Sequence, residues 1–129
     1  MPLFVGLASQ AQADASARVA AISLLACNGL VTTLRRTGQQ WDAPNGWAPL
    51  QWMVAMGLRH YGHTAVAAEI ASRWIASVHR VYRDTGRLLE KYDVMEDRAG
   101  GGGEYETQDG FGWTNATYSA FSDPLLGRR

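Results

Sequence analysis

Residues 64–86 read TAVAAEIASRWIASVHRVYRDTG and contain the clearest periodic pattern of the chain. Apolar side chains recur at the spacing of one helical face, at Val66, Ile70, Trp74, Val78 and Val81/Tyr82. Glu69 and Arg73 are four residues apart, in the order that favours an ion pair along a helix. The segment predicts an amphipathic helix with an N-cap at Thr64, ended by Gly86.

Weaker helical patterns flank this segment on both sides. Residues 8–26 are rich in alanine and place Ala15, Val19, Ile22 and Ala26 at helical spacing, and Asn28-Gly29 is typical of a helix end. Pro49 is typical of the first turn of a second helix, which we expect to end near Gly62. Residues 113–121 predict a short final helix.

Two long loops, residues 30–46 and 87–112, separate these helices, and the second is expected to contain short extended pieces. Both are longer than most connections in compact domains, and such loops often carry functional sites. The pattern predicts an all-α fold. No repeat or linker marks a boundary, so we expect residues 1–129 to belong to one domain.

Composition excludes several classes of protein. The 129 residues include 12 basic and 12 acidic side chains, so the net charge is zero and favours neither nucleic acid nor an anionic membrane as a partner. The longest apolar run, residues 19–27, is too short to span a bilayer. A single cysteine, Cys27, excludes an internal disulfide and is interpreted as a small core residue.

The first loop carries a tryptophan-rich motif, QQWDAPNGWAPLQW, at residues 39–52. Flat indole rings stack on the apolar faces of sugars, while amides and carboxylates bind the hydroxyl groups. Trp41 and Asn45 are candidate sugar contacts within it. The residues alone leave an alternative equally open, in which the tryptophans simply pack in a core.

The second loop carries two further motifs. Residues 88–94, LLEKYDV, place Glu90 between an apolar run and a cation; this Glu is either a positioned base or a solvated surface charge. Residues 100–115, GGGGEYETQDGFGWTN, begin with four glycines. Glu104, Trp113 and other polar and aromatic residues come directly after them. Consecutive glycines allow the backbone to approach a ligand closely, whereas a plain flexible linker rarely carries such aromatics.

Other kinds of site find no support in the sequence. The three histidines do not have the spacing of a metal motif, and no nucleophile elbow or phosphate loop is present. We therefore expect no metal and no cofactor.

Together the three motifs resemble consecutive C-terminal signatures of the α,α-trehalases, the inverting glycoside hydrolases that split trehalose into two glucoses. The resemblance covers most of the chain. It implies an (α/α)6 toroid, of which residues 1–129 would be the C-terminal part of a single catalytic domain. It also implies that Glu90 is the general base and that Glu104 contacts the sugar; Trp41, Asn45 and Trp113 lie in matching loops, but no specific contact is implied for them.

The sequence also departs from the family pattern. The family's general acid is an aspartate on an upstream segment, accompanied by substrate-binding arginines, and neither is found here. Asp14, Asp42 and Asp93 do not occupy the motif of the acid. Ala116-Thr117 stands where the family usually continues with Gly-Val, and the last nine residues match nothing in it.

The resemblance implies that this chain carries the base side of a site that hydrolyses trehalose. We expect the isolated chain to release no detectable glucose, since it lacks the acid. The alternatives are a sugar-binding module without turnover, a segment that complements an N-terminal partner chain, and a truncated reading frame. Self-association is a further expectation, because helices of an incomplete toroid expose apolar faces. The compartment, bacterial periplasm or cytoplasm, is left open.

Overall fold

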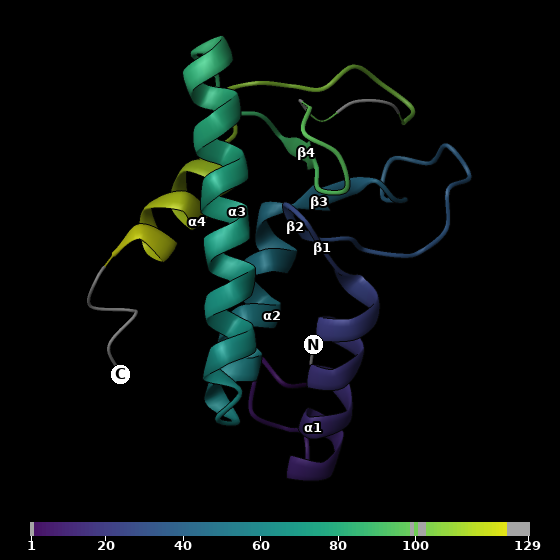
Figure 1. Cartoon of the computed structure of the whole chain (residues 1–129), viewed down its shortest axis with the longest axis vertical. Helices are drawn as coiled ribbons and strands as arrows, with labels where there is room; N and C mark the ends of the chain where they lie inside the picture. The colour runs from purple at the N-terminus through teal and green to yellow at the C-terminus, as the bar shows by residue number, and fades with distance from the viewer. Residues whose placement is uncertain (1, 99, 101–102, 124–129) are drawn as a thin grey trace.

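The computed structural model describes residues 2–98, 100 and 103–123 (Figure 1). Helices dominate the described residues, which agrees with the all-α expectation, and the strands are only two or three residues long. The elements in chain order are α1 (Gln10–Val19), the π-helix η1 (Ala20–Leu24), β1 (Leu25–Ala26), β2 (Gly29–Leu30), β3 (Asn45–Trp47), α2 (Ala48–His60), α3 (Thr64–Thr85), β4 (Lys91–Asp93) and α4 (Gly112–Ser122).

The long helix α3 is the central element, and its predicted apolar face is buried. Ile70, Trp74 and Val78 are completely inaccessible to solvent. The helix ends at Gly86, whose φ of 70° is the left-handed conformation that terminates many helices. The predicted N-cap is wrong by one residue, because Thr64 is already helical and His63 precedes it without a side-chain cap.

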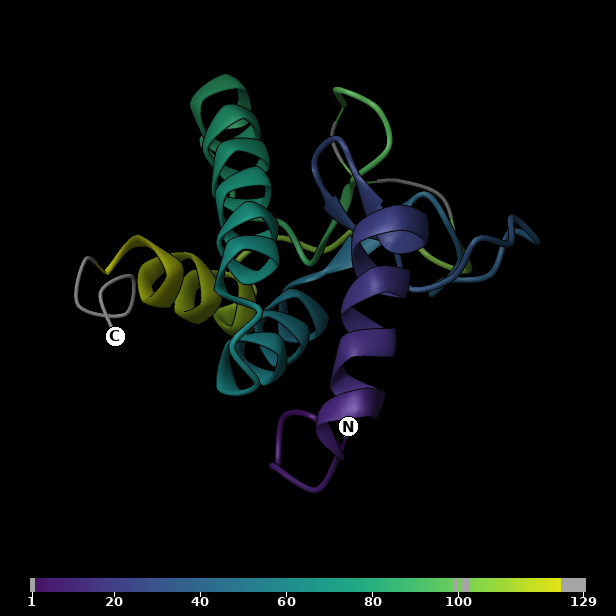
Figure 2. The same cartoon turned by 60° about the horizontal axis from the view of Figure 1, so that its bottom comes forward.

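Two shorter helices pack against α3. α2 carries a proline in its first turn, as predicted from Pro49, and it lies against both α3 and α4 (Figures 1 and 2). α4 confirms the predicted final helix and lies across the side of α3. The apolar core is built from these helices together with residues of α1, η1, β2, β4 and the two long loops. The loops lie at one end of the molecule beside β3 and β4 (Figure 1).

The N-terminal helix differs from its prediction. α1 stops at Val19 and continues as one π-helical stretch, and its buried side chains are small: Ala13, Ala17 and Ala20. The larger apolar side chains predicted for its packing face are exposed, with Val19 at 53% and Ile22 at 81%. Periodicity detects an apolar face but cannot tell whether this chain supplies the surface that would cover it.

Asn28-Gly29 does not end a helix. The chain turns at Cys27 and Asn28 between β1 and β2, which pair antiparallel with Ala26 opposite Gly29. Cys27 lies in the same turn and is exposed, so its assignment to the core is wrong. The fully buried amide of Gln51 on α2 holds the hairpin, since it bonds both the N–H and the carbonyl of Leu30 at 2.8 Å.

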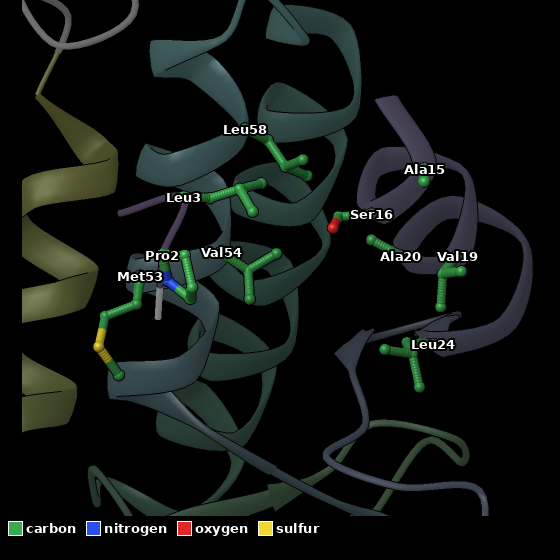
Figure 3. Close-up of a pocket in the computed structure, with 10 residues that line it drawn as sticks. All are labelled: Pro2, Leu3, Ala15, Ser16, Val19, Ala20, Leu24, Met53, Val54 and Leu58. Atoms are coloured by element: carbon green, nitrogen blue, oxygen red, sulfur yellow. The ribbon is translucent and has the colours of Figure 1, made fainter. Parts of the chain in front are cut away.

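An apolar pocket of about 450 Å³ lies between α1 and α2 (Figure 3). Val19 and Leu24 project into it from one side, and Leu3, Val54 and Leu58 project from the other. Separately, among the described residues no helix combines the length and apolarity that crossing a membrane requires.

Candidate active site

Two of the three motifs meet in a short antiparallel strand pair. β3 belongs to the tryptophan-rich motif, and β4 begins directly after Glu90; Trp47 pairs with Lys91 and Gly46 with Tyr92. The approach at Gly46 requires glycine, because a Cβ there would lie 2.4 Å from a methyl group of Val94. This pairing places Glu90 next to the tryptophan-rich loop.

The third motif holds the backbone of Glu90 in place. The Glu90 N–H donates to the carbonyl of Gln108 at 2.8 Å, and the indole N–H of Trp113 donates to the Glu90 carbonyl at 3.1 Å. The hydroxyl of Thr114 donates to the carbonyl of Leu89 at 2.7 Å. Glu90 therefore lies on a segment whose main chain is bonded on both sides.

The two carboxylate oxygens of Glu90 have different surroundings, and the residue as a whole is only 3% exposed. Oε1 accepts a hydrogen bond of 2.6 Å from the hydroxyl of Tyr105. Oε2 is buried and has no hydrogen-bond partner among the described residues. A buried carboxylate oxygen without a donor costs free energy, so it is a feature that binding sites retain and cores avoid.

A buried cation lies next to this carboxylate. Lys91 is fully buried, and its Nζ lies 5.1 Å from the ring centroid of Tyr105. Burial lowers the pKa of Lys91, and the charge of Glu90 opposes this effect. The hydrogen bond to Glu90, followed by burial, raises the pKa of Tyr105, so the phenol is protonated and donating at neutral pH.

Three tryptophan rings pack together next to the backbone of Glu90. The rings of Trp41 and Trp47 stack with centroids 3.8 Å apart, and Trp47 meets Trp113 edge-on at 5.9 Å. Trp47 is buried, whereas Trp41 remains 46% exposed. The stack therefore presents part of one indole to solvent, which is the arrangement that binds the apolar face of a sugar ring.

Gln40 connects the tryptophan-rich loop to the glycine-rich loop. Its Oε1 accepts from the N–H of Glu104 at 3.1 Å, and its own carbonyl accepts from Asn45 Nδ2 at 3.3 Å. Gln40 Nε2, Asn45 Oδ1 and the indole nitrogen of Trp47 are buried without partners among the described residues. Together with Glu90 Oε2, they form a set of unpaired donors and acceptors drawn from adjoining segments.

The predicted site residues lie in one region of the fold, but they differ in their contacts and in their exposure to solvent. Glu90, Trp41 and Asn45 lie in the β3–β4 region or its loops, and Trp113 bonds the Glu90 backbone while its ring packs against Trp47 and Phe111. Glu104 is exposed, and only its backbone is bonded to Gln40.

Sequence reasoning missed three residues of this site, Gln40, Trp47 and Tyr105. All three lie inside the quoted motifs, next to or near residues that the sequence singles out. Membership of those motifs is the signal that could have found them, but only the fold shows which atoms are buried and unpaired.

The aspartates outside the acid's motif have structural partners. Asp42 accepts hydrogen bonds from the backbone and the hydroxyl of Thr37, and these bonds lower the pKa of Asp42. Asp93 accepts from two backbone N–H groups and from Arg98 Nε at 2.6 Å. Asp14 pairs with His63 at 2.8 Å. Within the described part of the chain, no cluster of three or more His, Cys, Asp or Glu side chains is suited to a metal.

Comparison with known proteins accounts for this arrangement. The family model named trehalase matches residues 1–124 of the chain. The chain belongs to the trehalase family. A periplasmic trehalase of Pseudomonas aeruginosa is 55% identical over 115 residues, which cover 88% of this chain and 21% of that protein.

Solved structures place the fold within the trehalase toroid. The neutral trehalase of Saccharomyces cerevisiae matches 98% of this chain with a TM-score of 0.74 and 34% identity, over 23% of its own length. A mannosylglycerate hydrolase of Thermus thermophilus, solved with glucose, matches 93% of the chain with a TM-score of 0.60 and 26% identity, over 29% of its length. The chain thus spans between 21% and 29% of the length of these three proteins, and its fold is part of the trehalase toroid.

Proposed function

We propose that this chain supplies the base side of a trehalose-hydrolysing site, with Glu90 as the general base. The observation that carries the proposal is the buried, unpaired Oε2 of Glu90, whose other oxygen and whose backbone are both held in place. Membership of the trehalase family supports the substrate and the reaction. The glucose-bound hydrolase among the similar structures supports a sugar ligand.

In the proposed inverting reaction, a water molecule attacks the anomeric carbon of one glucose unit as Glu90 Oε2 removes a proton from it. The bond between that carbon and the bridging oxygen breaks, and a general acid protonates the departing glucose. Inverting hydrolases separate the two carboxyl groups by about 6.5–9.5 Å to leave room for the water. We assign the acid to a segment that this chain does not contain.

Trp41 and Glu104 are the proposed sugar contacts on this side. The exposed part of Trp41 supplies a flat apolar face, and Glu104 supplies a solvent-accessible carboxylate for a hydroxyl group. Asn45 and Trp113 have a supporting part in this proposal, because one holds the loop of Gln40 and the other holds the backbone of Glu90.

We also propose that residues 1–129 form part of one catalytic toroid and do not act as a separate domain. The exposed Val19 and Ile22 on α1 and η1, together with the apolar pocket between α1 and α2, support this view, because other helices of a toroid would cover such a surface. In isolation the same surface would favour association with a second copy.

A chimera tests the proposed function. The 115 residues that match the Pseudomonas aeruginosa trehalase would replace the corresponding segment of that protein, and the release of glucose from trehalose would be measured. We expect the chimera to turn over trehalose and the isolated chain to release no detectable glucose, because loss of a general acid alone costs about 10²–10⁴-fold. A chimera that is folded by circular dichroism but inactive would contradict the proposal, and so would turnover by the isolated chain.

A second prediction concerns Trp41. Trp41→Ala is expected to weaken trehalose binding to the chain about tenfold, the equivalent of one aromatic contact. Chemical-shift titration with trehalose measures the affinity. The control is Tyr82→Ala, which removes a similarly exposed ring from α3, and we expect it to leave the affinity unchanged. Equal effects of the two substitutions would argue against a sugar platform at Trp41.

A further inference from the structure

Tyr105 is the residue of the site that neither the motifs nor the proposed reaction assigns. Its hydroxyl donates to Glu90 Oε1 at 2.6 Å, a short bond of the charge-assisted kind. The side chain is about half exposed, so burial among apolar neighbours does not by itself explain its position. It follows Glu104, whose backbone N–H is fixed by Gln40.

We propose that Tyr105 is a positioning residue for the base, which holds Glu90 Oε1 so that Oε2 is the oxygen presented to the attacking water. The inference deepens the proposed function and rests on it. Three observations lead to it. The bond engages one carboxylate oxygen only, the other oxygen is buried without a partner among the described residues, and the Glu90 backbone is bonded on both sides.

The reason for such a device is the freedom of a glutamate side chain. A carboxylate with two equivalent oxygens can rotate about its terminal bond, whereas a donor fixed on one oxygen limits the orientations available to the other. Holding a reacting group in place saves the entropy that would otherwise be lost in the transition state.

Other groups around Tyr105 are consistent with its proposed role as a hydrogen-bond donor to Glu90. Lys91 Nζ lies 5.1 Å from the centre of the Tyr105 ring, where a cation is attracted to the aromatic face. Glu104 acts with Glu90 to disfavour the phenolate, and the amide of Gln40 opposes them, so that the pKa of Tyr105 is raised on balance. The phenol therefore stays protonated, and the donor remains in place across the neutral pH range.

The first test measures the pair in this chain and needs no turnover. Titration of Tyr105, followed by the ¹³Cζ resonances of labelled tyrosine and assigned with Tyr105→Phe, is expected to give a pKa above the ordinary 10.0. In Glu90→Gln that pKa should fall, because the carboxylate that disfavours the phenolate is gone. An identical Tyr105 titration in both proteins would overturn the inference.

The second test measures the consequence in the trehalase chimera. Tyr105→Phe is expected to lower kcat roughly tenfold with little change in KM, as loss of a hydrogen bond to a charged group predicts. Tyr82→Phe, a tyrosine far along α3, is the matched control and should change neither quantity.

The two proposals fail in different ways. A chimera without any turnover contradicts the proposed function, while the tyrosine titration still decides whether the Tyr105–Glu90 pair exists. An active chimera in which Glu90→Gln abolishes turnover but Tyr105→Phe retains the parental kcat leaves the base intact. That result would overturn the proposed positioning role of Tyr105 but not the assignment of Glu90 as the base.

Discussion

Glu90→Gln is expected to lower kcat of the trehalase chimera by about 10²–10⁴-fold, the range usual for loss of a general base. Glutamine keeps the volume of the side chain and an oxygen that can accept from Tyr105, so the local structure should persist. It cannot accept a proton from water. The effect should therefore fall on kcat, whereas KM for trehalose changes little, and steady-state kinetics separates the two.

The matched control is Glu106→Gln, which removes the same charge at an exposed position between β4 and α4. We expect it to retain the activity of the unsubstituted chimera. Similar losses in both variants would indicate a general effect of charge and would argue against Glu90 as the base. A chimera that keeps full activity with Glu90→Gln would contradict the assignment outright.

Trp74→Ala is expected to destabilise the chain by about 3–5 kcal/mol, as for other large aromatic side chains removed from a core. Trp74 is completely buried on α3 and meets Tyr92 of β4 edge-on, with ring centroids 5.1 Å apart. The substitution therefore removes a ring contact between the central helix and the strand next to Glu90. Urea denaturation monitored by circular dichroism measures the free energy of unfolding.

Trp41→Ala is the control for that experiment, because it removes the same side chain from a position that is 46% exposed. Its expected cost is about 1 kcal/mol or less, the worth of its stacking on Trp47. The two substitutions should therefore have different effects: Trp74→Ala lowers stability, and Trp41→Ala weakens the affinity for sugar. Equal destabilisation by both would show that the packing differs from the one described.

The two tyrosines near the site, Tyr92 and Tyr105, also differ in their surroundings. Burial raises the pKa of Tyr92 to about 12, and its hydroxyl accepts a bond from the Leu89 N–H at 2.9 Å. Tyr92 is thus a packing residue in the strand next to the site, whereas Tyr105, on the surface loop, contacts the carboxylate itself.

The sequence predicts the helices correctly where one chain segment carries the whole signal. The apolar face of α3, its end at Gly86 and the proline at the start of α2 all depend on residues close together in the chain. Prediction fails at α1, whose exposed Val19 and Ile22 depend on a surface elsewhere. It also fails at Asn28-Gly29, because a hairpin turn and a helix end use the same residue types.

The site shows the same division. The three motifs indicate the family and single out Glu90, because long runs of specific residues are rarely matched by chance. The motifs do not distinguish Glu104, whose side chain is exposed, from Tyr105, whose hydroxyl bonds the proposed base. Adjacent residues in an irregular loop point in directions that the sequence does not encode locally.

By itself, the sequence determined the helical class of this chain, its membership of the trehalase family and the segments that we propose carry its chemistry. Only the tertiary structure decided which atoms of those segments meet. The β3–β4 pairing and the bonds from Gln108, Trp113 and Tyr105 join residues that are far apart in the chain. Whether a polar atom is paired or left free depends on such long-range contacts, and this explains why the unpaired Oε2 of Glu90 emerged only from the fold.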